Sequence, residues 1–139
     1  ANDFMFRKTV RDDGKVAKDL LKEIKIDCKD NIEMSEMVDL TSKTLDYILE
    51  NRDDQEMLSC ISFDYLMGFG YLVGGWLMDK AKRSANKKLL EPSQNEVFLK
   101  SKIVSAEFYD LHILPRIGYH LKVVMRGAKV VQTANDSFV

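Results

Sequence analysis

Histidine and cysteine side chains are the first candidates for chemistry in this 139-residue chain, which has two of each. Di-metal carboxylate sites in helical bundles need two inward-facing Glu-x-x-His pairs. Neither His112 nor His120 has a glutamate three residues before it. The two histidines are separated by about two helical turns, so they can share a helix face but are too far apart to bind one metal ion. We expect His112 to be a packed or hydrogen-bonded helix residue, with a proton carrier as the alternative.

The two thiols, Cys28 and Cys60, lack the neighbours that activate a cysteine. Lys29 follows Cys28 directly, which is a weak signal for a stabilised thiolate. Two isolated cysteines in a chain of this size indicate a reducing compartment rather than a disulfide framework. We therefore expect both to be small buried apolar residues.

Paired acids and clustered glycines are the other features that could serve a reaction. The pairs Asp12–Asp13 and Asp53–Asp54 stand where helices are expected to begin, and N-capping accounts for them. The Gly68–Gly70 segment lies inside a helical run rather than between a strand and a helix, which excludes a phosphate-binding loop. No Gly-x-Ser-x-Gly motif occurs. The sequence therefore predicts no catalytic, cofactor-binding or metal-binding residue.

Helices would have to position any such residue, and apolar side chains recur at helical spacing through most of the chain. We expect helices over residues 1–26, 34–51, 54–84 and 93–126, followed by a tail over 127–139. Asp12–Gly14 interrupts the first segment, which predicts either a bend or two abutting helices. Asp53-x-x-Glu56 resembles a capping box. Short connections make neighbouring helices antiparallel, so the prediction is an all-α, up-and-down antiparallel bundle of four to five helices in a single domain, 1–139.

The segment 54–84 is apolar on almost every face, which predicts a central helix. Four glycines lie within it, and we expect them to allow close helix packing, with a ligand pocket as the alternative: Gly68, Gly70, Gly74 and Gly75. The run Lys80–Lys88 is rich in cations, which the helix dipole favours at a C-terminus. A solvated helix end is the expected role of this run, and a basic docking patch is the alternative.

The segment 93–126 opens with Ser93-x-x-Glu96, a full capping-box pattern. Pro115 falls within it and should kink the axis near residues 111–115. Gly127 is placed as a C-cap. Helical spacing predicts that one apolar face points inward: Val97, Val104, Phe108, Leu111, Leu121 and Met125.

Overall composition restricts the class of partner. The formal net charge is -1, so no nucleic-acid or anionic-membrane partner is indicated. The longest uncharged stretch, Tyr65–Met78, is too short to span a bilayer. No signal peptide is evident at the start of the chain, and we expect a cytoplasmic protein.

Three segments resemble a known family. Ala1–Gly14 (ANDFMFRKTVRDDG) is similar to a stretch of pattern A-x-D-x-x-x-R-K-x-x-x-D-G-G, with Asp13 in place of the first glycine. Phe98–Arg116 ends in F-Y-x-x-H-x-L-P-R, and Gly74–Met78 (GGWLM) resembles the same family's central helix. The family is that of acyl-CoA dehydrogenases with an additional C-terminal helical region, and the closest branch includes methylthiopropanoyl-CoA dehydrogenase.

The resemblance implies an FAD-dependent parent that oxidises an acyl-CoA thioester to its 2,3-enoyl form, in fatty acid metabolism. It also implies that the catalytic glutamate lies just upstream of Ala1, and that the FAD pocket and the acyl-CoA cleft belong mainly to the domains upstream. No catalytic residue transfers to this chain, which by itself is expected to bind no cofactor and to be inactive.

The leading hypothesis for function is therefore a structural C-terminal domain. Its partners would be the remainder of the parent enzyme and a homo-oligomer, and its roles packing on the enzyme core, oligomer contacts or covering the active-site entrance. The alternative is a free-standing helical protein-interaction module. A third reading is an autonomous enzyme with a site inside the bundle.

Overall fold

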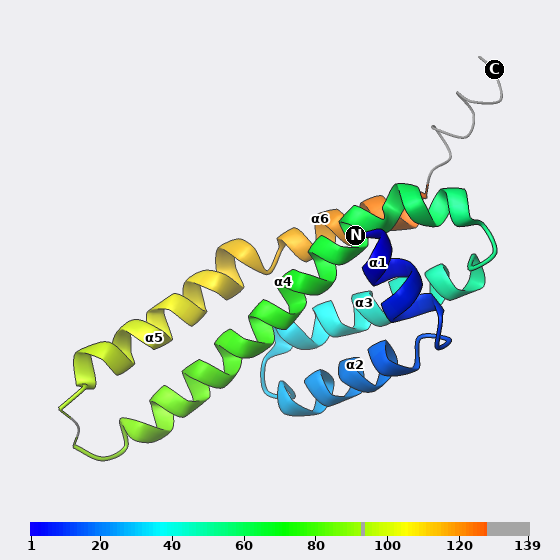
Figure 1. Cartoon of the computed structure of the whole chain (residues 1–139). Helices are drawn as coiled ribbons and strands as arrows, with labels where there is room; N and C mark the ends of the chain where they lie inside the picture. The colour runs from blue at the N-terminus through cyan, green and yellow to red at the C-terminus, as the bar shows by residue number, and fades with distance from the viewer. Residues whose placement is uncertain (93, 128–139) are drawn as a thin grey trace.

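The predicted all-α class is confirmed by a computed structural model that describes residues 1–92 and 94–127, in which every element is helical. Helices α2, α3, α4 and α6 form the bundle, and α5 lies beside one end of α4 (Figure 1). Two elements, η1 and η2, are π-helical turns. The elements are α1 (Asn2–Met5), η1 (Phe6–Val10), α2 (Lys15–Asp27), α3 (Ile32–Glu50), α4 (Gln55–Lys88), α5 (Glu96–Phe108), η2 (Tyr109–Ile113) and α6 (Arg116–Arg126).

The first expected helix is divided at a sharp turn. Asp13 and Gly14 have φ values of 62° and 74°, in the left-handed region that glycine adopts most readily. The Asp12 carboxylate accepts hydrogen bonds from the backbone N–H groups of Gly14 and Val16, at 3.1 and 3.0 Å. A Cβ at Gly14 would lie 2.8 Å from Leu49 Cδ1, so a larger residue would also displace the end of that side chain. Of the two alternatives the structure has abutting helices with an acidic cap.

Side-chain caps start α3 and α4. Asn31 accepts a hydrogen bond from the Met34 N–H at 3.1 Å, and α3 begins two residues earlier than expected, at Ile32. Asp54 accepts one from the Met57 N–H at 3.0 Å. The cap of α4 is therefore Asp54 rather than the Asp53 of the predicted capping box, because the helix starts one residue later than that pattern implied.

Helix α4 is central, as its apolar faces predicted: it packs against α1, α3, α5 and α6. Leu58, Ile61 and Leu72 are fully buried along it. The buried Tyr65 hydroxyl meets Thr9 Oγ1 at 3.1 Å, and burial raises the pKa of Tyr65 to about 12. By length and hydropathy alone α4 could also cross a membrane, but core helices of water-soluble proteins share this property and here α4 lies within a bundle.

The segment expected to be one helix over 93–126 consists of α5, η2 and α6. Ser93 lies outside the described residues, and α5 begins at Glu96. Pro115 has no N–H and cannot continue a regular helix from its preceding turn. The chain widens into η2 just before it, where the Leu114 N–H donates to the Tyr109 carbonyl at 2.9 Å, and α6 starts directly after it. Gly127 is the C-cap of α6.

The apolar face expected to point inward over 93–126 does so only in α6. Leu121 is fully buried and Met125 partly buried, but Val97, Val104, Phe108 and Leu111 are 84, 64, 57 and 70% exposed. The reason is that α5 extends past the bundle and packs mainly on α4 through its opposite side, where Leu99 and Ala106 are buried (Figure 1). We call the end of α4 from Lys80 onward, together with α5, the arm.

Candidate functional site

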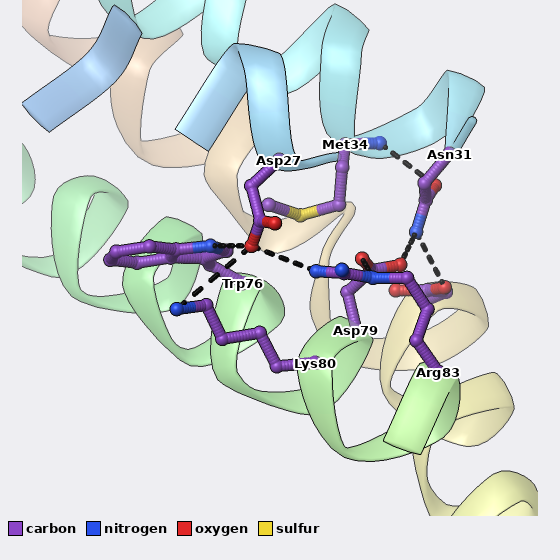
Figure 2. A network of polar contacts seen from close by, with 8 residues as sticks. Asp27, Asn31, Met34, Trp76, Asp79, Lys80 and Arg83 are labelled. Carbon is purple, nitrogen blue, oxygen red and sulfur yellow. Dashed lines mark hydrogen bonds and ion pairs between the residues drawn. The ribbon is translucent and has the colours of Figure 1, made fainter. Parts of the chain in front are cut away.

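A polar network joins the corner between α2 and α3 to the C-terminal half of α4 and to η2 (Figure 2). It borders a cavity of about 270 Å³, which is the most polar of the described hollows. Its members come from four elements or connections that are far apart in the sequence: Asp27, Cys28, Asn31, Trp76, Asp79, Lys80, Arg83 and Asp110.

Asp27, the last residue of α2, is held by three side chains of α4. Its Oδ2 accepts hydrogen bonds from Trp76 Nε1 at 2.7 Å and from Arg83 Nη2 at 2.8 Å. Lys80 Nζ lies 3.9 Å from the same oxygen and 4.2 Å from the centre of the Trp76 ring. The hydrogen bonds from Arg83 and Trp76 lower the pKa of Asp27, so the group is a stable carboxylate.

Asn31 connects two further carboxylates while it caps α3. Its Nδ2 donates to Asp79 Oδ1 at 3.0 Å and to Asp110 Oδ2 at 3.3 Å. Asp79 is buried, and its other oxygen accepts from Arg83 Nε at 2.8 Å. Burial, opposed by the hydrogen bond from Asn31, raises the pKa of Asp110, and the negative charge of Asp79 raises it further.

The thiols differ from each other. Cys28 is buried beside the network, where burial and then the charge of Asp79 raise its pKa to about 12. A thiol with this pKa is protonated at neutral pH and is a poor nucleophile. Cys60 is exposed, which corrects the expectation that both cysteines are buried, since its position on α4 faces solvent rather than a neighbouring helix.

The two histidines have separate environments. His120 of α6 meets Asp64 of α4, with 2.7 Å between Nδ1 and Oδ1, and stacks on the ring of Tyr71. His112 lies in η2, exposed, with its ring centre 4.6 Å from that of Phe108. The expectation of a packed or hydrogen-bonded residue therefore suits His120 better than His112. Within the described residues no set of three or more His, Cys, Asp or Glu side chains is placed to hold a metal ion.

At three of the four glycines of α4, neighbouring side chains fill the space that a ligand would need. A Cβ at Gly68 would lie 2.7 Å from Leu121 Cδ2, and one at Gly75 would lie 2.8 Å from Met34 Sδ. Gly74 lies beneath the Tyr109 hydroxyl, which donates to the Tyr71 carbonyl at 2.7 Å. Only around Gly70, among these four, would a Cβ find nothing within 4 Å.

The basic run at the end of α4 is partly a set of ion pairs. Lys80 and Arg83 serve the network, and Lys82 Nζ lies 3.5 Å from Glu107 Oε1 of α5. Lys87 and Lys88 are exposed in the last turn, as a solvated helix end requires. Neither of the two expected roles describes the whole run.

Comparison with known proteins decides the family. A model of the family described as acetyl-CoA dehydrogenase C-terminal like matches residues 20–134. The chain belongs to this family. The search of curated proteins and that of solved structures each gave no significant match. The resemblance to the C-terminal region of acyl-CoA dehydrogenases is thus confirmed at the level of the family.

Membership in an acyl-CoA dehydrogenase C-terminal family implies FAD in the full-length parent. Two of the places described above, the packed glycines of α4 and the polar cavity, do not fit that group. Side chains fill the space beside Gly68 and Gly75. The polar cavity is lined by five acidic and two basic side chains, which would repel a pyrophosphate.

The network of this family domain was not predicted from the sequence. The sequence feature that could have indicated the network is Asp79. It is a single carboxylate at the end of a long apolar stretch, with Trp76 three residues before it and Arg83 four residues after it. The partners Asp27, Asn31 and Asp110 are far from it in sequence and carry no pattern of their own. The network pairs charged side chains of different helices, and it holds the corner between α2 and α3 against α4.

Proposed function

We propose that this chain is the C-terminal helical domain of an FAD-dependent acyl-CoA dehydrogenase. The parent enzyme oxidises an acyl-CoA to its 2,3-enoyl form, belongs to the branch similar to methylthiopropanoyl-CoA dehydrogenase, and works in the cytoplasm. The observation that carries the proposal is the family match over residues 20–134. The domain has a structural role: it packs on the enzyme core, supports contacts between subunits or covers the active-site entrance.

The interior of the domain supports a structural role rather than a catalytic one. The buried carboxylate of Asp79 is paired with Arg83 and Asn31, and the buried thiol of Cys28 is protonated. Asp79 is buried and both of its oxygens accept hydrogen bonds from these partners, so it is poorly placed to contact a substrate. The residues that a partner would contact are on the surface, where several large apolar side chains are exposed.

The test uses the chain itself and its gene. The purified chain, mixed with FAD and an acyl-CoA in the presence of an electron-accepting dye, should retain no flavin and reduce no dye. The reading frame upstream of Ala1 should encode a flavin-binding core. Turnover by the isolated chain would refute the site assignment, and a start codon immediately before Ala1 would refute the proposed parent.

A free-standing interaction module is the second candidate, and the exposed apolar surface of α5 is the observation that favours it. The sequence upstream of Ala1 also distinguishes these two candidates. A flavin-binding core in frame excludes the module, and a start codon at this point supports it.

A further inference from the structure

We propose that the outer surface of α5 binds the same surface of a second copy of this chain, with the two helices antiparallel. This surface, which we call the α5 face, consists of Val97, Val104, Phe108 and the adjacent Leu111. The proposal deepens the structural role proposed above, because it names the partner and the residues through which subunits meet.

The α5 face has the spacing of a helix-pairing seam. Its members are separated by 7, 4 and 3 residues, with Ser101 at the remaining seam position between Val97 and Val104. All four apolar members are more than half exposed, at 84, 64, 57 and 70%. An apolar row of this kind on a water-facing helix marks an interaction surface.

The helix is already packed on its other side. Leu99 and Ala106, 6 and 1% exposed, point toward α4, and Ala85 of α4 is 3% exposed. The two helices of the arm therefore pack against each other, and the α5 face stays exposed to solvent when they do. Two arms that meet through their α5 faces form a four-helix arrangement in which each α5 is covered on both sides.

Charge favours a second copy in the antiparallel direction. Lys100 and Glu107 flank the α5 face on one side, and they lie on either side of Val104 in the sequence. When two α5 helices cross antiparallel near Val104, Lys100 of each copy comes opposite Glu107 of the other, which gives two complementary pairs. Both side chains are on the surface and already make ion pairs within their own chain, at 2.7 Å to Glu96 and 3.5 Å to Lys82.

The size of the α5 face sets the strength of the contact. From Val97 to Leu111 a helix extends about 21 Å at 1.5 Å per residue. A pair of single helices of this length buries less than the roughly 800 Å² per partner that is usual for a stable complex. The isolated chain should therefore dimerise weakly, and a parent enzyme that brings two copies together would strengthen the contact through effective concentration.

Cysteine cross-linking tests the surface and the direction together. In a Cys60→Ser background, Val104→Cys should form a disulfide-linked dimer under mild oxidation, whereas Ser84→Cys, an exposed site on the other helix of the arm, should not. A mixture of Val97→Cys and Leu111→Cys chains should cross-link, and Val97→Cys alone should remain monomeric. Dimers of Val97→Cys alone, or no excess of Val104→Cys dimer over the Ser84→Cys control, would overturn the proposal.

Sedimentation equilibrium on the whole chain tests the charges. Lys100→Glu should raise the dimer dissociation constant several-fold, and the reversed pair Lys100→Glu/Glu107→Lys should restore it. Val104→Asp should raise it by about tenfold or more while circular dichroism stays unchanged, since Val104 is exposed in the monomer. Binding of the chain to phosphatidylcholine vesicles that is lost in Val104→Asp, without any dimer, would assign the α5 face to a lipid surface and refute a second copy. These experiments need neither flavin nor substrate, so they can fail while the proposed parent enzyme stands.

Discussion

Replacing Asn31 by alanine should be among the more destabilising single changes at the surface-accessible corner of this fold. Asn31 makes three hydrogen bonds with two functions: its Oδ1 caps α3, and its Nδ2 donates to Asp79 and Asp110. Loss of an N-cap costs about 1 kcal/mol. Loss of the donor to a buried carboxylate adds about 1–2 kcal/mol, because Arg83 remains as a partner of Asp79.

The expected total for Asn31→Ala is a fall of about 2–3 kcal/mol in the free energy of unfolding. At roughly 3–5 °C per kcal/mol for a chain of this size, Tm should fall by about 10 °C. Urea denaturation monitored by circular dichroism at 222 nm measures the first quantity, and a thermal scan measures the second.

Two matched variants divide this effect. Asn31→Ser keeps a good capping oxygen but removes the amide donor, so it should recover only about 1 kcal/mol of the loss. Asn31→Asp also keeps the cap but places a third carboxylate beside Asp79 and Asp110, and it should be less stable than the serine variant at neutral pH. If Asn31→Ala changes stability by less than about 0.5 kcal/mol, or if the serine variant matches the wild type, the argument that Asn31 connects the two carboxylates is refuted.

Three further results are expected. Gly75→Ala should lower the free energy of unfolding by about 1–3 kcal/mol, since its Cβ would lie 2.8 and 2.9 Å from two core side chains. Gly70→Ala, whose Cβ would have nothing within 4 Å, should raise the free energy of unfolding by about 0.5–1 kcal/mol. Urea denaturation of both variants measures this difference, and equal effects would contradict it. An aromatic disulfide reagent at neutral pH should label Cys60 at once and Cys28 only on unfolding, and equal rates would show that Cys28 is not shielded. Asp27→Asn should destabilise the fold at pH 7 but progressively less in acid. A carboxyl whose pKa is lowered in the folded state contributes stability above its unfolded pKa, and this contribution is lost as the pH falls through the folded pKa. A difference in unfolding free energy between wild type and variant that does not shrink between pH 7 and pH 3 would rule this out.

Local signals in the sequence predicted much of the fold because each arises from contacts within a few residues. The interruption of the first helix at Asp12–Gly14 was expected from the residue types, and the break before α6 follows from the missing N–H of Pro115. The central place of α4 follows from apolar residues on every face.

The errors arose where one pattern has two physical outcomes. An apolar row on α5 predicts burial, but spacing cannot distinguish a row that faces its own core from one that faces a partner, and Val97 and Val104 are exposed. The polar network was missed because it depends on tertiary contacts, as in the hydrogen bond from Asn31 to Asp79, which are 48 residues apart. Nothing in the sequence near either residue specifies that contact.

The polar network holds the start of the arm against the bundle. Asp79 and Arg83 stand where the arm leaves the bundle, and they are bonded to the corner between α2 and α3 through Asn31 and Asp27. These contacts tie the corner between α2 and α3 to the part of α4 from which the arm extends. The direction in which α5 points therefore depends on α4 and on polar contacts made by residues that lie outside α5.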